Sequence, residues 1–221
     1  MPSGHSSDDQ YAVTLAVETT GSVVGVHALL AVGAAVVDLR TQMCVQYHEW
    51  YLRPSGTWDD SCVAEYWSQR PELAAYLASR PLHLNPQAAG QALHEWLQRV
   101  LGTKAKVFLV VDAAAFTVPW LDALLGTAGL PPMHLCHPKG GYQPVVDLQS
   151  VYLAAKHLAF WWPSRWSLLP PILSSTPTLL TPKAKAYMLG VRFARCMRST
   201  EWEPVVSDTL SGPAFLLAPA C

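Results

Sequence analysis

Three apolar segments near the start of the chain predict three consecutive β-strands. Residues 11–17 and 28–39 are short runs of apolar and β-branched residues, and residues 43–52 alternate between apolar and polar side chains. Short apolar runs indicate buried strands, and alternation indicates a strand with one exposed face. Only brief polar stretches separate the three segments, so we expect an antiparallel meander.

Apolar residues at helical spacing begin after residue 60. Val63, Tyr66 and Trp67 predict a helix that Asp60 or Ser61 would cap. Further elements are predicted in this order: a short helix from Pro71, a helix over residues 86–101 that stops at Gly102, a strand over 107–111, a helix over 119–125, a strand end leading into a helix over 145–158, and a helix over 183–197.

This order of elements predicts an α/β domain with a mixed β-sheet, in which three antiparallel strands are joined by parallel strands and flanked by helices. Residues 1–10 are expected to form a disordered tail and residues 11–198 the domain. Within the domain, residues 159–182 form an irregular insertion rich in Trp and Pro, and residues 199–221 form a C-terminal extension.

Composition supports a packed domain and gives little sign of strong nonspecific binding to nucleic acid. Apolar residues make up 51% of the 221 residues, charged residues make up 14%, and the net charge is −1. Five basic residues lie close together in the last predicted helix, and they form either a solvated helix face or a phosphate-binding stripe. They are Lys183, Lys185, Arg192, Arg195 and Arg198.

Cysteine usage and the first residues of the chain predict where the protein resides. The five cysteines are scattered without a CxxC pair, and the first ten residues are polar and acidic, unlike a signal or transit peptide. No apolar stretch reaches the ~20 residues of a membrane span. We therefore expect a soluble intracellular protein, in the cytoplasm or the nucleus, with free thiols and no membrane partner.

Several motifs together resemble the DEDD (DnaQ-like) 3′–5′ exonucleases of the ribonuclease H-like superfamily. The family's first motif is Asp-x-Glu-Thr-Thr-Gly, and the chain has Ala16-Val17-Glu18-Thr19-Thr20-Gly21. The other matching segments are the apolar run 29–39, Leu52-Arg53-Pro54 at the exit of the third strand, Trp58-Asp59-Asp60 with Glu65-Tyr66-Trp67 after it, residues 111–117 as the second motif, and residues 178–190 as the third. The likeness covers residues 11–198.

The resemblance implies a metal-dependent nuclease site from which acidic residues are missing. Such enzymes use two divalent metals, ~4 Å apart, held mainly by four carboxylates. Here Ala16 and Thr117 stand at two of those positions, and Glu18 is retained. Lys183 falls on the third-motif Asp and Thr178 on the third-motif His, so Lys183 would replace a cation electrostatically and pair with Glu18.

Other acidic residues offer a relocated metal site as an alternative. No Asp or Glu occurs between Ser150 and Thr200. Asp112, at the end of the fourth strand, and Asp147, before a helix, could join Glu18 as ligands, or each could cap the element that follows it. Asp122 lies further along its helix. Separately, His134, Cys136 and His137 either hold a soft metal or are incidental loop residues.

Three functions are therefore considered. The first is a catalytically degenerate exonuclease-like protein that binds nucleic acid or a protein, without a cofactor; Thr19, Thr20 and Gly21 would contact a terminal nucleotide of single-stranded RNA or DNA, and Phe116 would pack beneath the cleft. The second is an active 3′–5′ exonuclease that uses Mg²⁺ or Mn²⁺ through Glu18 and relocated ligands. The third is a structural subunit that binds a protein partner or a second copy through its Trp-rich segment.

Overall fold

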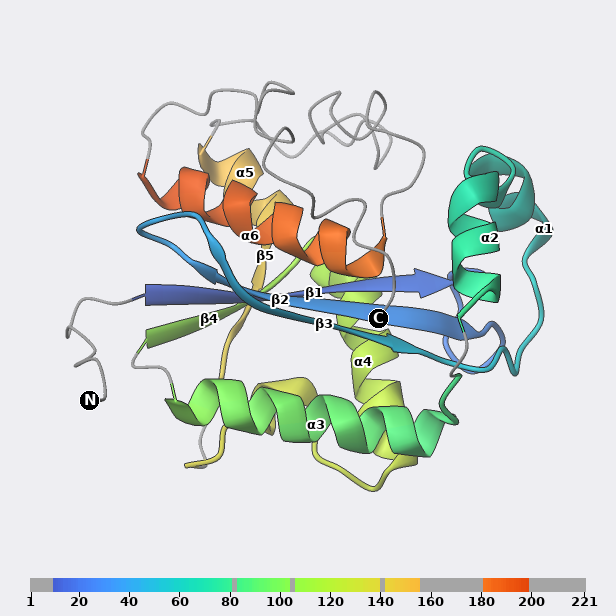
Figure 1. Ribbon diagram of the computed structural model, residues 1–221, viewed down its shortest axis with the longest axis horizontal. Helices are drawn as coiled ribbons and strands as arrows, with labels where there is room; N and C mark the ends of the chain where they lie inside the picture. The colour runs from blue at the N-terminus through green and yellow to red at the C-terminus, as the bar shows by residue number, and fades with distance from the viewer. Residues whose placement is uncertain (1–9, 81–82, 104–105, 140–141, 156–180, 199–221) are drawn as a thin grey trace.

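The computed structural model describes residues 10–80, 83–103, 106–139, 142–155 and 181–198, which form a five-stranded sheet with helices on both faces (Figure 1). The strands are β1 (Gln10–Thr19), β2 (Leu29–Asp38), β3 (Cys44–Tyr51), β4 (Lys106–Val111) and β5 (Val145–Asp147). The helices are α1 (Asp60–Cys62), the π-helix η1 (Val63–Trp67), α2 (Pro71–Ala78), α3 (Pro86–Thr103), α4 (Ala114–Thr127), the 3₁₀-helix η2 (Met133–Leu135), α5 (Leu148–Ala155) and α6 (Pro182–Arg198).

The sheet has the strand order β3-β2-β1-β4-β5. β2 pairs antiparallel with β1 and with β3, whereas β4 is parallel to both β1 and β5. The predicted meander and the predicted mixed sheet are therefore confirmed. Since β1, β4 and β5 are parallel, their carboxyl ends meet at one edge of the sheet, where side chains from distant parts of the chain can converge.

Alternate residues of β1 face two different layers of helices. Val13 and Leu15 are completely buried in a core cluster that includes residues of α3 and α4. Ala12 and Ala16 face the other side, in a cluster with residues of α5 and α6. Because side chains of a strand alternate between faces, Glu18 follows Ala16 on the α6 side.

α6 approaches the sheet so closely that its first turn requires a glycine beneath it. A Cβ atom on Gly33 of β2 would lie 2.1 Å from the carbonyl carbon and oxygen of Pro182. In the sheet, Gly33 pairs with Ala16 on one side and with Glu49 on the other. The start of α6 therefore lies over β2, between β1 and β3.

A third cluster covers the end of the sheet near η1 and α2. Trp67, Leu73 and Leu77 are buried there against Ala28 and Leu30. This packing brings the segment after β3 beside the carboxyl end of β1, as Figure 1 shows.

Several predicted boundaries were wrong for local reasons. β1 runs on to Thr19, so Glu18 lies inside the strand, and Asp59 caps α1 by accepting a bond from the Cys62 N–H at 3.0 Å. α4 begins at Ala114, because the chain turns directly after β4 and tolerates Pro119 inside the helix. α3 continues through Gly102 to Thr103.

Three predicted regions fall mostly outside the described residues. These are the tail before Gln10, the Trp- and Pro-rich insertion up to residue 180, and the extension from residue 199. Thr178, which belongs to the predicted insertion, is likewise not among the described residues. Among the described helices, none is long and apolar enough to cross a membrane.

Candidate functional site

Glu18 is a buried carboxylate near the carboxyl end of β1, and its side chain is 2% exposed. Lys185, in the first turn of α6, forms an ion pair with Glu18 Oε1. The Tyr66 hydroxyl of η1 donates a hydrogen bond to Glu18 Oε2 at 2.7 Å. Both carboxylate oxygens thus have a protein partner.

The electrostatics of this triad keep Lys185 charged and Tyr66 neutral. Burial alone would lower the pKa of Lys185, but the adjacent Glu18 carboxylate and Tyr66 outweigh it, so the pKa lies above its ordinary value. Burial, together with the Glu18 charge, raises the pKa of Tyr66 to about 12. At neutral pH a lysine ammonium and a phenol O–H therefore hold Glu18.

Lys183, to which the third-motif Asp had been aligned, does not pair with Glu18. Its ammonium lies 3.8 Å from Glu49 Oε2, and its backbone N–H donates to Glu49 Oε1 at 2.8 Å. Side chains two residues apart on an α-helix point in directions that differ by ~200°. Lys185 therefore faces β1, whereas Lys183 faces β3. The predicted pairing of Lys183 with Glu18 was therefore wrong by two residues.

Asp112 lies near Lys185 and Arg192, and one of its carboxylate oxygens is buried without a hydrogen-bond partner among the described residues. Burial raises the pKa of Asp112, although the charges of Arg192 and Lys185 oppose this shift. Asp112 follows β4 directly, and its own backbone carbonyl accepts a bond from Gln149 N–H at 3.2 Å. Within the part of the chain that the structure describes, the Asp112 side chain makes no capping bond.

Asp147, at the end of β5, has a structural role that the sequence allowed for. Its Oδ1 accepts from Ser150 N–H at 3.1 Å, which caps α5, and its Oδ2 accepts from Ala114 N–H at 3.0 Å at the start of α4. Asp122 accepts from Met133 N–H at 2.8 Å and so stabilises the start of η2. Both carboxylates are thus occupied by backbone donors.

The two positions where the family pattern has further acids are built into the protein interior. Ala16 is 7% exposed within the cluster beneath α6, and Thr117 of α4 is 4% exposed. Phe116, beside it, is only partly buried. Neither an alanine nor a threonine supplies a carboxylate.

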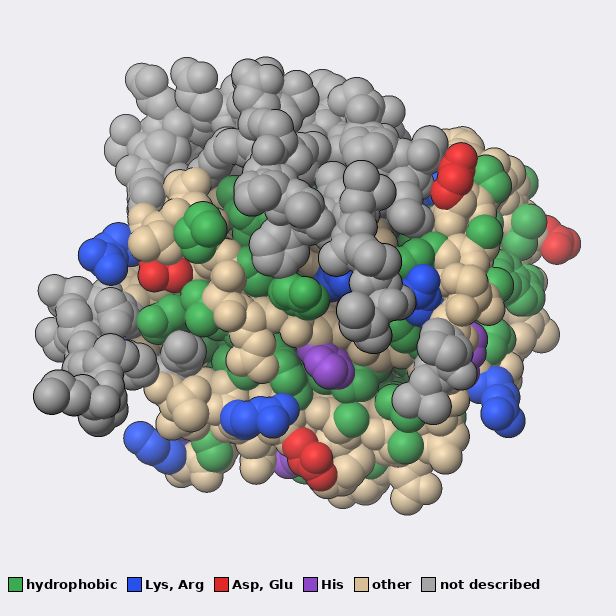
Figure 2. Space-filling model, in the orientation of Figure 1, with side chains coloured by type: hydrophobic (Ala, Val, Ile, Leu, Met, Phe, Trp, Pro, Cys, Tyr) green, Lys and Arg blue, Asp and Glu red, His purple; other side chains and the backbone are tan. Residues whose placement is uncertain are grey.

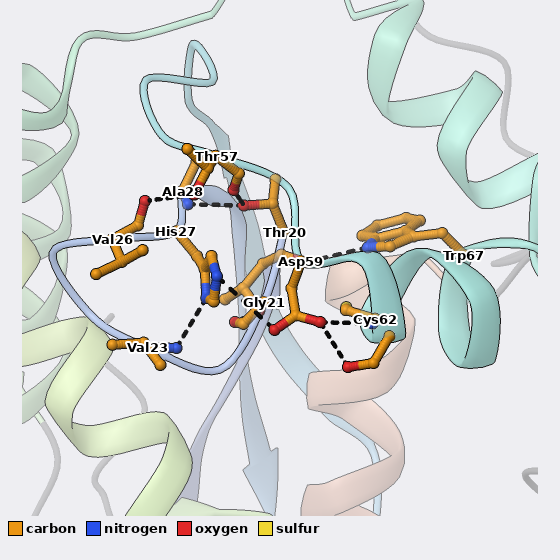
Figure 3. Close-up of polar contacts among 12 residues, drawn as sticks. Thr20, Gly21, Val23, Val26, His27, Ala28, Thr57, Asp59, Cys62 and Trp67 are labelled. Carbon is orange, nitrogen blue, oxygen red and sulfur yellow. Dashed lines mark hydrogen bonds and ion pairs between the residues drawn. The ribbon is translucent and has the colours of Figure 1, made fainter.

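The predicted nucleotide-contacting residues Thr19, Thr20 and Gly21 make hydrogen bonds within the protein, and Figure 3 shows those of Thr20. Thr20 Oγ1 donates to the Thr57 carbonyl at 2.6 Å and accepts from Ala28 N–H at 2.8 Å. Thr19 Oγ1 donates to the Gly21 carbonyl at 2.7 Å. The Thr20 hydroxyl joins the end of β1 to the loop that follows β3, whereas the Thr19 hydroxyl bonds within its own segment.

His27 covers Gly21 in the same loop. A Cβ atom on Gly21 would lie 2.3 Å from His27 Nδ1, which accepts from Val23 N–H at 3.0 Å. The other ring nitrogen lies 3.8 Å from Asp59 Oδ2, and the Thr19 carbonyl accepts from Trp67 Nε1 at 3.1 Å. The loop is therefore fixed from both sides, as the dashed contacts in Figure 3 show.

These residues do not fit a pair of divalent metals. Among the described residues, no group of three or more His, Cys, Asp or Glu side chains is arranged to hold a metal ion. Glu18, Asp112 and Asp147 do not form such a group, and neither do His134, Cys136 and His137. Glu18 is instead neutralised by a lysine, which cannot coordinate Mg²⁺ or Mn²⁺.

Two of the basic residues of α6, Lys185 and Arg192, do not lie on a solvated helix face. Arg192 is 3% exposed, and the Lys185 side chain is 21% exposed. They share an inward-facing side of the helix with the buried residues Ala186, Leu189 and Phe193. On the coloured part of the face in Figure 2, Lys and Arg side chains are separated from one another by acidic, apolar and other side chains.

Sequence reasoning missed Lys185 and Tyr66 as partners of Glu18. The signal for Lys185 lies in the helix period, because Leu189 and Arg192 follow it at intervals of four and three residues, on the same inward face. Tyr66 was assigned to the apolar side of a helix, and its hydroxyl gives no separate signal in the sequence.

The comparisons with solved structures are informative about the fold, although no protein-family model and no curated protein matches the chain. The zinc-bound complex of E. coli exonuclease I with single-stranded DNA matches with a TM-score of 0.55 at 14% identity, over 86% of this chain and 39% of that chain. A 3′-exonuclease specific for the 3′ end of the histone mRNA stem-loop matches with a TM-score of 0.54 at 14% identity, over 86% of this chain and 80% of that chain.

The nuclease domain of 3′hExo, a DEDDh family member bound to rAMP, matches with a TM-score of 0.50 at 15% identity, over 86% of this chain and 90% of that chain. The chain has a ribonuclease H-like fold. At these identities the likeness to DEDDh 3′-exonucleases establishes the fold alone. The chain spans only 39–42% of the exonuclease I chains that it matches.

Proposed function

We propose that this chain is a catalytically inactive exonuclease-fold protein that binds the end of single-stranded nucleic acid without cleaving it. The observation that carries the proposal is the ion pair between Lys185 and Glu18. The Lys185 ammonium is paired with Glu18, the one carboxylate retained from the family's first motif. Ala16 and Thr117 supply no further carboxylates. Two-metal phosphodiester cleavage needs several carboxylates around one place.

The binding part of the proposal is supported by what similar proteins hold and by an aromatic side chain beside the site. Exonuclease I was solved with single-stranded DNA and 3′hExo with rAMP. Trp58, next to the Thr57 that anchors Thr20, is 47% exposed and contacts Trp67 edge to face, with ring centroids 5.8 Å apart. Aromatic faces stack on any base.

Two assays on the full chain test both parts. With an oligonucleotide labelled at its 5′ end, we expect no shortening in Mg²⁺ or Mn²⁺, and fluorescence anisotropy should show saturable binding. Replacing Trp58 with Ala should weaken binding about tenfold. The matched control is Tyr142→Ala, which removes an aromatic side chain that is 72% exposed and lies before β5, at the opposite edge of the sheet.

Each other result points to a different function. Metal-dependent shortening that Glu18→Ala abolishes would establish an active exonuclease and overturn the proposal. No binding to RNA or DNA would leave the protein-interaction role, which the near-neutral charge of −1 also allows. The contacts expected from Thr19, Thr20, Gly21 and Phe116 remain predictions that the same binding assay can test.

A further inference from the structure

A second buried carboxylate, Glu49, lies under the start of α6. Its side chain is 8% exposed, and it pairs in the sheet with Gly33, the residue against which Pro182 packs. Glu49 Oε1 accepts from the Lys183 backbone N–H at 2.8 Å, in the first turn of the helix. A negative charge at this position also stabilises the helix N-terminus.

Two tyrosines complete the surroundings of Glu49. Tyr51 of β3 donates to Glu49 Oε2 at 2.5 Å, Tyr76 of α2 donates to the same oxygen at 3.2 Å, and the two hydroxyls lie 3.0 Å apart. Burial and the hydrogen bond to Glu49 raise the pKa of Tyr51, so its hydroxyl stays a donor. Glu49 thus joins β3, α2 and α6.

The contacts of Glu49 resemble those of Glu18 across α6. Each carboxylate meets a lysine of the first turn and a tyrosine from the segment between β3 and α3. The tyrosines Tyr66 and Tyr76 each lie under an arginine four residues later, at 4.1 Å and 3.9 Å from the guanidinium to the ring centre. The helix is therefore held on both sides of β2.

This double attachment fixes the rotation of α6 about its own axis. Lys183 and Lys185 project in directions ~200° apart, one toward Glu49 on β3 and the other toward Glu18 on β1. Rotating the helix to loosen one contact pulls on the other. Within the same turn the Lys185 backbone N–H donates to the Thr181 carbonyl at 2.9 Å, and the contact from Ala184 N–H to Thr181 Oγ1 is longer, at 3.4 Å.

We propose that Glu49 is a positioning residue, which acts through the first turn of α6 to place Lys185 against Glu18. The inference rests on the proposed function, because it concerns how Lys185 is kept in contact with the Glu18 carboxylate. It predicts that a change at Glu49 alters Lys185, although Glu49 bonds to Lys183, Tyr51 and Tyr76 and not to Lys185.

The test measures proton exchange of the Lys185 ammonium by ¹⁵N NMR in the full chain, with its signal assigned by Lys185→Arg. In Glu49→Gln, which keeps the side-chain size, we expect exchange to be faster by roughly tenfold, the effect of losing one charged hydrogen bond. The matched control, Glu72→Gln, removes an exposed charge from α2 and should leave exchange unchanged. Unchanged exchange in Glu49→Gln overturns the proposal.

Two further measurements separate positioning from a general loss of stability. The double variant Glu49→Gln, Lys185→Met should change the unfolding equilibrium constant by a factor that differs at least about threefold from the product of the two single-variant factors. A factor equal to that product would contradict the coupling. If Glu49→Gln does not fold, Tyr76→Phe removes one bond to Glu49, and the same exchange experiment should show a smaller acceleration; no acceleration overturns the proposal. These measurements use neither metal nor nucleic acid. A failure of the chain to bind nucleic acid would therefore count only against the proposed function.

Discussion

Lys185, in the first turn of α6, forms an ion pair with Glu18, which lies 167 residues earlier near the end of β1. The pair closes the contact between the last described helix and the central strand of the sheet. In a metal-dependent enzyme of this fold, cations would balance the carboxylates. Here a side chain of the protein supplies the positive charge, and it does so without leaving the carboxylate open to a metal.

Removing the lysine should destabilise the protein strongly. In Lys185→Met the Glu18 carboxylate, which is 2% exposed, loses its ionic partner, and the cost should be about 3–5 kcal/mol of unfolding free energy at pH 7. Urea denaturation followed by circular dichroism measures it. Because the pKa of Lys185 is raised above its ordinary 10.5, the pair's contribution is full below that pH and is lost as pH rises further.

A double variant serves as the control for this interpretation. Glu18→Gln combined with Lys185→Met removes both charges and keeps similar side-chain sizes, so it should recover much of the stability lost in Lys185→Met alone. A double variant that is as unstable as the sum of the two single variants would mean that Lys185 acts through its packing and not through its charge.

Removing the charge of Asp112 should have the opposite effect on stability from removing that of Lys185. Its pKa is raised by burial, so ionisation costs stability in the folded state at neutral pH. Asp112→Asn should therefore raise the unfolding free energy at pH 7, and the gain should shrink as pH falls toward the ordinary aspartate pKa of 3.8. Denaturation curves at several pH values measure this. A loss of stability at pH 7 would mean that the carboxylate is held by favourable charges.

Most of the sheet could be predicted from the sequence, because strand signals are local. The apolar runs around β1, β2 and β4 need no knowledge of their neighbours, and the Glu-Thr-Thr-Gly segment lies close to the end of β1, although the strand continues two residues beyond the predicted boundary. Glu18 was thus placed at the right edge of the sheet. The parallel β5 was foreseen only as a strand end, since three residues give little pattern.

The partners of Glu18 could not be predicted in the same way, because they depend on helix rotation and on distant packing. A two-residue error on α6 exchanges Lys183 for Lys185 and moves the side chain from β1 to β3. The close approach of Pro182 to Gly33 sets where the helix lies over the sheet, and nothing near Gly33 in the sequence indicates which helix will cover it. The sequence pattern singles out Tyr66 for its apolar ring, although it is the hydroxyl that contacts Glu18.

Gly33 provides a direct test of how tightly α6 must approach the sheet. In Gly33→Ala the new methyl group would meet the Pro182 backbone at 2.1 Å, so the helix must shift, at a cost of about 1–3 kcal/mol. Thermal and urea unfolding measure the loss. The matched control is Gly126→Ala in α4, where an added Cβ meets nothing within 4 Å and should stabilise the helix by about 0.5–1 kcal/mol. Equal effects at the two glycines would contradict the close packing.

Introducing acidic residues offers a strict test of whether residues 16, 117 and 185 surround one site with Glu18. In the variant Ala16→Asp, Thr117→Asp, Lys185→Asp, three carboxylates would join Glu18, and the set should bind Mn²⁺. Since a ligand that binds only the folded state stabilises it, by about 2.7 kcal/mol at one hundred times its Kd, the melting temperature of this variant should rise with added Mn²⁺. The wild-type chain should show no such rise.

The matched control replaces the same three residues by asparagine, which has nearly the shape of aspartate without its charge. It should lose stability as the acidic variant does, but its melting temperature should not respond to Mn²⁺, because amide oxygens are much weaker ligands than carboxylates. A response by the wild-type chain would reveal a ligand set that its sequence does not suggest. If the acidic variant folds but its melting temperature does not respond to Mn²⁺, then residues 16, 117 and 185 do not surround one site with Glu18, which contradicts the proposed reason for inactivity.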